Sequence, residues 1–343
     1  MRFVASATLR RNDLRGLLER WQRASSGADP GADPFREIIL TPLPGLSEPA
    51  TVKFVREHFV GRSTIWFDSG GYFVQQGEIT YEDLYGRLMT WYLDNRWADV
   101  YVLPDYVPSS DLSDEEVAER IHATISITRL FSHELPEDIR QKALPVVQGH
   151  TREQIRACVD AYLTMGYRRL GFGSFDTTGA GKDINILTRR ALSNLEFLQD
   201  LAARYGFQTH AFGIGTPALI PVLHELGVSS FDSSCWIRTA GFGNVLLPFL
   251  GRRNVSHGML REIGGQPYNA ESFARLKSLT NHSCPFCESF DRLQNNRLDQ
   301  AMHNLLVIRD TVAALEKGID SLTPEIISII GESRYSRLRT RRI

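Results

Sequence analysis

The chain has 343 residues, of which 42% are hydrophobic and 23% charged, an ordinary globular composition with enough length for one large barrel or two modest domains. It has 39 Lys and Arg residues and 40 Asp and Glu residues, which gives a formal net charge of -1. This net charge does not indicate a nucleic-acid partner, so any polyanion-binding surface must be local. Four cysteines are too few for a disulfide framework, and no apolar run approaches the length of a membrane span. We therefore expect a cytoplasmic protein with no membrane segment.

The first 36 residues are predicted to be an N-terminal appendage. A helical pattern covers Asn12 to Ala24, and a linker rich in Gly, Pro and Asp follows at 25–34.

From residue 37 onward, short β-rich runs alternate with longer amphipathic segments, which is typical of repeated βα units around a parallel sheet. The predicted strands are Glu37 to Pro42, Thr64 to Phe67, Val100 to Leu103, Leu144 to Val147, Arg169 to Phe172, Gln208 to Ile214 and Val228 to Phe231. The predicted helices between them are Tyr81 to Asn95, Asp114 to Phe131, Thr151 to Met165, Thr188 to Tyr205 and Pro217 to Leu226.

The placement of polar residues distinguishes a closed barrel from an open sheet. Each of these residues lies at or just past the end of a different strand: Asp68, Asp105, Gln148, Ser174, Gly215 and Asp232. In a (β/α)8 barrel such positions converge on one mouth, where active sites are built. An open doubly wound sheet usually carries a glycine-rich phosphate turn after its first strand, and none occurs there. The sequence therefore predicts an α/β fold, a TIM barrel over residues 37–275.

Residues 276–343 are predicted to hold a zinc-binding subdomain, the last barrel helix and a basic tail. The segment Asn281-His-Ser-Cys-Pro-Phe-Cys287 and a helical run to His303 supply two thiols and two imidazoles. His282, Cys284, Cys287 and His303 would make a closed tetrahedral site, which favours structural zinc over a reaction centre. The alternative is a pair of buried thiols beside two unrelated histidines.

The tail is a candidate polyanion surface, although such tails are often only solvated. Its arginines are Arg334, Arg337, Arg339, Arg341 and Arg342, and Arg252-Arg253 forms a smaller second patch.

The segment Phe67-Asp-Ser-Gly-Gly-Tyr72 combines a strand-end acid with two glycines that let the backbone approach a flat ligand. It is followed in order by Val147-Gln-Gly149, Gly213-Ile-Gly-Thr-Pro217, Phe231-Asp-Ser233 and the cysteine loop. This series resembles the tRNA-guanine transglycosylase superfamily over about residues 60–310.

The resemblance implies that guanine in a nucleic acid is exchanged for a 7-deazaguanine through a covalent enzyme–sugar intermediate. Asp232 would be the nucleophile on C1′, and Asp68 the general acid and base for the leaving and entering bases. Asp105 would accept from the guanine edge, Gln148 would donate to O6, and the Gly173-Ser174 backbone would complete the edge. Tyr72 and Phe212 would stack on the purine, beside the backbone of Ser69, Gly70 and Gly71.

Simpler explanations exist for most of these residues. An Asp at a strand end is often a helix cap, and Tyr72 and Phe212 could be plain core aromatics. His150 and His210 are isolated and show no open metal site, which disfavours an unrelated metal-dependent hydrolase. The competing function is a catalytically silent homologue that binds nucleic acid or pairs with an active subunit.

Departures from the family pattern bear on the substrate. Bacterial tRNA enzymes of the family carry a Thr-Arg-Asn-Ala-Arg-like segment that binds RNA after the nucleophile. This chain has Ser233-Ser-Cys-Trp-Ile-Arg-Thr-Ala240 there, a sequence similar to the archaeal and the DNA-modifying branches. We therefore favour DNA slightly over tRNA. His282 stands where the family usually has the first zinc-binding Cys. Ser174 stands where the family has the second glycine of a Gly-Gly pair. A homodimer or hetero-oligomer is expected by analogy alone.

Overall fold

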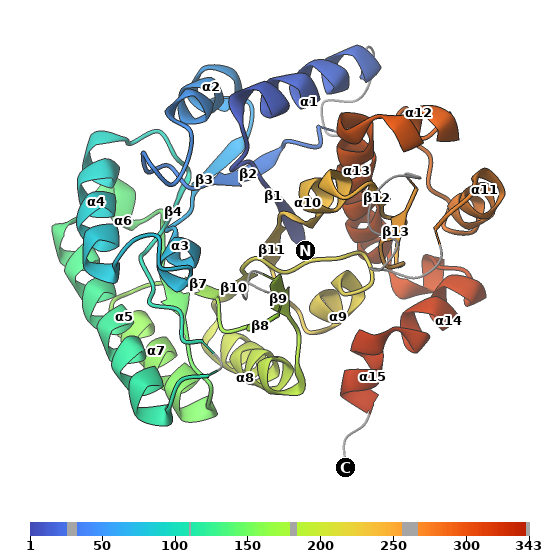
Figure 1. Cartoon of the computed structure of the whole chain (residues 1–343). Helices are drawn as coiled ribbons and strands as arrows, with labels where there is room; N and C mark the ends of the chain where they lie inside the picture. The colour runs from blue at the N-terminus through green and yellow to red at the C-terminus, as the bar shows by residue number, and fades with distance from the viewer. Residues whose placement is uncertain (26–32, 110, 179–183, 256–266, 341–343) are drawn as a thin grey trace.

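The computed structural model describes the chain apart from residues 26–32, 110, 179–183, 256–266 and 341–343. Its centre is a parallel sheet of nine short strands ringed by helices, seen along the barrel in Figure 1. The strands are β1 (Arg2–Ser6), β2 (Glu37–Leu40), β3 (Thr64–Phe67), β4 (Val100–Val102), β5 (Ala143–Leu144), β6 (Val146–Val147), β7 (Arg169–Phe172), β10 (Gln208–Ala211) and β11 (Ser230–Ser233).

These nine strands occupy eight places, because β5 and β6 are two halves of one strand interrupted at Pro145. Proline has no N–H for the ladder, but its carbonyl still accepts from the Gly171 N–H at 2.8 Å. The β5 half pairs with β4 and the β6 half with β7, so the neighbours run in chain order around the ring. The predicted (β/α)8 barrel is confirmed.

The eighth place belongs to β1, which sequence analysis had assigned to an appendage. Residues Arg2–Ser6 pair in parallel with both β11 and β2 and so close the barrel. Burial of Phe3, Val4 and Ala5 explains why this strand is held in the sheet. The appendage interpretation is therefore wrong for the first residues; the boundaries at 36 and 275 stay predictions.

All seven predicted strands are present. Thr64–Phe67 and Arg169–Phe172 have the predicted bounds, and the other five have shifted ends. β10 stops at Ala211, three residues earlier than predicted, because Gly213 adopts a positive φ of 62° that ends the extended run. β11 begins two residues later than predicted and extends to Ser233, so Asp232 lies within the strand. After β10 the chain therefore bends at Gly213, at the mouth of the barrel, instead of continuing as a strand.

Helices begin where the sequence offers capping side chains. Ser113 and Thr151 form capping boxes with Glu116 and Gln154, and Thr80 and Thr188 cap two further helices. The helices up to β11 are α1 (Arg11–Ala24), α2 (Pro49–Phe59), α3 (Gly71–Gln75), α4 (Tyr81–Asp94), α5 (Asp114–Glu134), α6 (Glu137–Arg140), α7 (Arg152–Thr164), α8 (Arg189–Tyr205) and α9 (Ile220–Glu225). None of the helices in the described ranges is long and apolar enough to cross a membrane.

The barrel interior holds its own small apolar cluster, separate from the core between strands and helices. It consists of Val4, Ile39, Trp66, Val100, Val102, Leu144 and Val146, with Phe212 packed on it. Side chains two positions apart share a face of a strand. Asp68 therefore lies on the same inward face as Trp66, and Phe212 on the same inward face as His210. The apolar cluster is thus the floor beneath the polar mouth.

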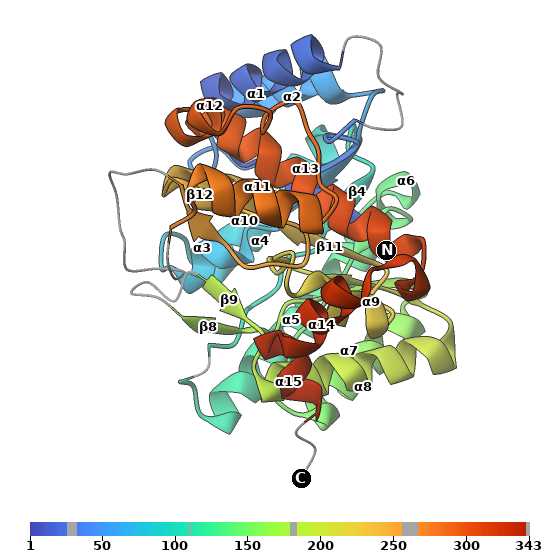
Figure 2. The ribbon, with the colours of Figure 1, turned by 90° about the vertical axis from the view of Figure 1, so that its right-hand side faces the viewer.

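After β11 the chain builds a second layer on one side of the barrel. Its elements are α10 (Cys235–Gly241), β12 (Asn244–Val245), β13 (Arg253–Asn254), α11 (Ala270–Leu279), α12 (Phe290–Asn295), α13 (Arg297–Glu316), the 3-10 turn Ile319–Ser321, α14 (Pro324–Glu332) and α15 (Arg334–Thr340). α13 packs on α10 and α1 and completes the helical ring. Figure 2 shows α3 and the hairpin of β8 (Asp176–Thr178) and β9 (Ile184–Ile186) on the side opposite the N-terminus, which marks the mouth.

Candidate active site

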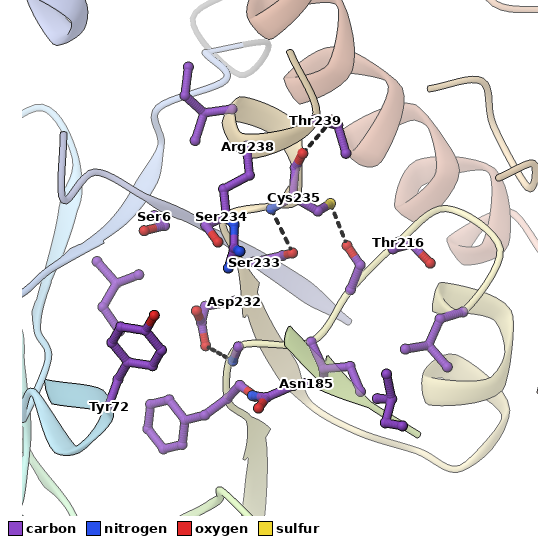
Figure 3. Close-up of a pocket in the computed structure, with 18 of the residues that line it drawn as sticks. Ser6, Tyr72, Asn185, Thr216, Asp232, Ser233, Ser234, Cys235, Arg238 and Thr239 are labelled. Carbon is purple, nitrogen blue, oxygen red and sulfur yellow. Dashed lines mark hydrogen bonds between the residues drawn. The ribbon is translucent and has the colours of Figure 1, made fainter. Parts of the chain in front are cut away.

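A cavity of about 1230 Å³ opens at the carboxyl ends of the strands. Asp68, Asp105 and Asp232, which follow or end three different strands, all line it. Figure 3 shows Asp232 and Tyr72 facing the same space, with Arg238 extending from α10 beside them. The cavity is larger than a purine needs, and typical ligand pockets span about 300–1000 Å³.

Asp232 is fixed through a single oxygen. Its Oδ1 accepts from the Gly213 N–H at 2.7 Å and lies 3.3 Å from Nε2 of His210. The positive φ of Gly213 turns its N–H toward the strand end, and a side chain there would meet Asn185 at 2.7 Å. The carboxylate is therefore oriented from behind by backbone and imidazole, while its residue borders the cavity.

Asp68 is a carboxyl group that holds its proton more tightly than usual. Burial is the largest cause of its raised pKa, and the charges of Asp232 and Asp105 raise this pKa further, to about 7. Thr41 donates to its Oδ2 at 3.1 Å. A carboxyl that titrates near neutrality is suited to give and take protons at a reaction centre.

A hydrogen-bonded chain fixes the third acid. Asp105 accepts from Ser69 at 3.0 Å and from the Gln148 amide at 2.6 Å. The Gln148 carbonyl in turn accepts from Ser174, whose Oγ accepts from the Gly149 N–H, both at 2.6 Å. Burial raises the pKa of Asp105 to about 6. This chain of hydrogen bonds fixes a carboxylate and an amide beside the cavity, where they can bind a polar ligand.

The two predicted stacking rings are placed differently. Tyr72 is 43% exposed and lines the cavity, so it is not a core aromatic. Phe212 also lines the cavity but rests on the barrel interior, 4.5 Å from the His210 ring centroid. A side chain at Gly171 would come within 2.1 Å of the Phe212 ring, which explains the glycine there.

The structure brings most of the predicted site residues to one cavity. Ser69, Gly71, Tyr72, Asp105, Gln148, Gly173 and Phe212 line it together with the two catalytic candidates Asp68 and Asp232. Gly70 and Ser174 are not among its described lining residues. Gly70 supplies a positive φ of 82° before α3, and Ser174 orients Gln148, so both act behind the surface.

Sequence analysis missed Thr41 and His210. His210 is buried inside the barrel and contacts Asp232, so it belongs to the site, a role that the sequence did not predict. Its position two residues before Phe212 on an inward-facing strand row was the available signal. Thr41 follows β2 as Asp68 follows β3, and a polar residue at that strand end could have been read in the same way.

The four predicted metal ligands form one buried cluster that can hold a metal ion. His282 Nε2 and His303 Nδ1 lie 3.3 Å apart, the two sulfur atoms 3.3 Å apart, and Cys284 Sγ 3.4 Å from His303 Nδ1. A tetrahedral zinc ion with bonds of about 2.0–2.3 Å places neighbouring ligand atoms roughly 3.3–3.8 Å apart. These three spacings match zinc, and all four ligand atoms lie within 4.8 Å of one another.

The outer nitrogen atoms of both imidazoles have partners, as in metal sites. His282 Nδ1 lies 2.7 Å from the Asp310 carboxylate, and His303 Nε2 donates to the Leu246 carbonyl at 2.8 Å. Each ring thereby turns its remaining nitrogen to the cluster. The cluster joins the loop 282–287 to α13, the last helix of the barrel.

One arginine of the basic tail, Arg334 at the start of α15, lines the same cavity together with Arg252 and Arg253. Arg238 joins them from α10. Arg341 and Arg342 lie outside the described residues.

Comparison with known proteins fits this geometry. The model of the family described as queuine tRNA-ribosyltransferase matches residues 94–321, more than half of the chain. Among curated proteins, the chain is 24% identical over 260 residues to the tRNA-guanine(15) transglycosylase of Aeropyrum pernix. The match covers 73% of this chain but only 43% of that relative, so the chain spans less than half its length. With its barrel, its acids at the mouth and this family match, the chain belongs to the queuine tRNA-ribosyltransferase family.

Proposed function

We propose that this protein exchanges guanine in a polynucleotide for a 7-deazaguanine of the 7-cyano-7-deazaguanine type. The observation that carries the proposal is the convergence of Asp68, Asp105 and Asp232 on one cavity, with the pKa of Asp68 raised to about 7. Family membership and the name of the archaeal relative support the same reaction class.

The reaction is a double displacement. Asp232 bonds to C1′ of the target nucleotide as the C1′–N bond to guanine breaks, and the departing base takes the proton of Asp68. The entering 7-deazaguanine then gives a ring-nitrogen proton to Asp68, bonds to C1′ and releases Asp232 as a carboxylate. Asp68 begins and ends the cycle protonated, which suits a carboxyl with a pKa near 7.

Asp105 and Gln148 recognise the base. Each carboxylate oxygen of Asp105 has capacity beyond its present hydrogen bond and accepts from the N–H groups of the guanine edge. The second amide hydrogen of Gln148 is directed to O6, and the Gly173 backbone closes the edge. Tyr72 and Phe212 stack on the two faces, after the nucleotide leaves its own stack.

The substrate strand is proposed to be DNA, with tRNA as the second candidate. The segment after Asp232 lacks the RNA-gripping sequence of bacterial tRNA enzymes, which favours DNA. The name of the archaeal relative favours tRNA. A cytoplasmic location and a homo- or hetero-oligomeric state also stay predictions.

Labelled 7-cyano-7-deazaguanine offered in parallel with duplex DNA and with total tRNA tests the function. Label in DNA alone supports the first candidate and label in tRNA alone the second. Label in neither nucleic acid contradicts the transferase and supports a silent homologue.

The cavity rim supports a polyanionic substrate. Among the described lining residues are four arginines, Arg238, Arg252, Arg253 and Arg334, and near Arg334 the acid Glu332. The charges of Arg252 and Arg238 both act on the thiol of Cys235, three residues after Asp232, so these guanidinium groups lie near the reaction centre. Arginine at such a rim holds phosphate groups of the bound strand.

We expect Arg252→Ala and Arg253→Ala each to weaken nucleic-acid binding through the loss of one phosphate contact. The slope of log K against log salt should fall in magnitude by about 0.7–0.9 for each variant. Filter binding over a salt series measures it. Arg56→Ala removes an exposed arginine of α2 away from the cavity and should leave the slope unchanged. Equal slopes in all four proteins would contradict a phosphate-binding rim.

The buried cluster is proposed to hold one structural zinc ion. His282, Cys284, Cys287 and His303 supply four ligands and leave no open position, so zinc would contribute folding energy and no step of the exchange.

Cys284→Ala is expected to lose the zinc ion and several degrees of thermal stability, because α13 is then no longer tied to the loop 282–287. Elemental analysis and thermal unfolding with and without a chelator measure both effects. Cys158→Ala is the matched control: Cys158 is buried but remote from the cluster, so this variant should keep one zinc ion per chain. Full zinc content in Cys284→Ala would refute the site.

A further inference from the structure

A histidine beneath the nucleophile is the most informative buried group outside the residues already given a role. His210 lies inside the barrel on β10 and is 1% exposed. Its Nε2 lies 3.3 Å from Oδ1 of Asp232, and its Nδ1 lies 2.9 Å from Oγ of Ser230. The ring packs between Trp66, at 4.7 Å between centroids, and Phe212, at 4.5 Å.

The chemistry of the partners determines the tautomer. A carboxylate only accepts, so Nε2 carries the proton that points to Asp232. Burial lowers the pKa of His210 and outweighs the attraction of Asp232, while the charges of Arg169 and Arg2 lower this pKa further. The ring is therefore neutral, and its bare Nδ1 accepts from the hydroxyl of Ser230. Ser230, His210 and Asp232 form one directed chain of hydrogen bonds.

This chain makes the two oxygens of Asp232 different. Oδ1 receives the N–H of Gly213 at 2.7 Å as well as the imidazole, and among the described residues no hydrogen bond reaches Oδ2. An oxygen that accepts two donors is a poor nucleophile, whereas the other keeps its electron pairs available. The same two donors stabilise the negative charge when the carboxylate departs in the second displacement.

We propose that His210 is a positioning residue for the transfer, whose Nε2–H fixes Oδ1 of Asp232 so that Oδ2 is the atom that bonds to C1′. The inference rests on the proposed base exchange. In the first displacement the Oδ2–C1′ bond forms as the C1′–base bond breaks, and Oδ1 becomes the ester carbonyl oxygen. In the second, the Oδ2–C1′ bond breaks and its electron pair returns to Asp232.

The test compares variants that keep or lose the donor. His210→Phe retains a ring against Trp66 and Phe212 but has no N–H, whereas His210→Gln retains an N–H at a similar reach. We expect His210→Phe to slow formation of the covalent adduct about 10- to 100-fold, with the KM of the entering base changed by less than about threefold. His210→Gln should recover most of the rate. Ser230→Ala should slow the adduct by a smaller factor, because the tautomer is no longer fixed.

The outcomes are separable from those for the proposed function. If the wild-type protein forms no adduct, the base exchange itself is refuted. If the wild type forms it and His210→Phe forms it equally fast, only the positioning role is overturned. Equal loss of rate in His210→Phe and His210→Gln would assign His210 to packing alone. Should His210→Phe fail to fold, His210→Asn, whose amide is too short to reach Asp232, replaces it in the comparison with His210→Gln.

Discussion

Asp232→Ala is expected to abolish base exchange, with a loss of at least about 10⁴-fold, because the proposed reaction passes through a bond between the Asp232 carboxylate and C1′. The structure places this carboxylate in the cavity with one oxygen held by Gly213 and His210. An alanine leaves both donors without an acceptor. Denaturing gels of enzyme mixed with labelled nucleic acid measure the adduct directly, and it should be missing in the variant.

Ser234→Ala is the control for this experiment, since Ser234 lines the same cavity two residues further along. It should form the adduct at close to the wild-type rate. A stable adduct in Asp232→Ala would show that another side chain is the nucleophile and would refute the assignment of Asp232. Guanine binding, which we propose to depend on Asp105 and Gln148, should persist in both variants.

Asp68→Asn is expected to lower both half-reactions by about 10²- to 10⁴-fold, the usual contribution of a positioned acid–base group. In the wild type, guanine release requires protonated Asp68 and should decline as pH rises through about 7. Attack by the entering base requires ionised Asp68 and should decline as pH falls below about 7. Single-turnover measurements of each half-reaction over pH 5–9 should show both limbs in the wild type and neither in the variant.

The same substitution affects stability with a defined sign. The folded-state pKa of Asp68 is raised from 3.8 to about 7, so the unfolded chain releases this proton first. Stability from this group is therefore full below about pH 4 and declines as pH rises through about 7. Asparagine removes that decline, and the free energy of unfolding of Asp68→Asn should exceed the wild-type value by about 1–3 kcal/mol at pH 8 but not at pH 4. A variant that is less stable at pH 8 would contradict the raised pKa.

Local patterns in the sequence were sufficient for most of the fold. Alternating β-rich and helical segments predicted seven strands that are all present, five of them with shifted ends. The strand Arg2–Ser6 was not predicted, because a run of only five residues carries little periodic signal. Its place was decided by pairing with β11, more than 220 positions away.

The amino-acid sequence by itself determined the barrel, the residues at its mouth and the composition of the candidate metal site, since strand ends and ligand spacing are local properties. Tertiary structure alone decided how these groups act on one another. The elevated pKa of Asp68 arises from burial beside Asp232 and Asp105. The orientation of Asp232 arises from His210 on the adjacent strand and from Gly213 just after that strand. Desolvation and hydrogen-bond direction depend on what surrounds a group in space, and neighbours along the chain do not specify it.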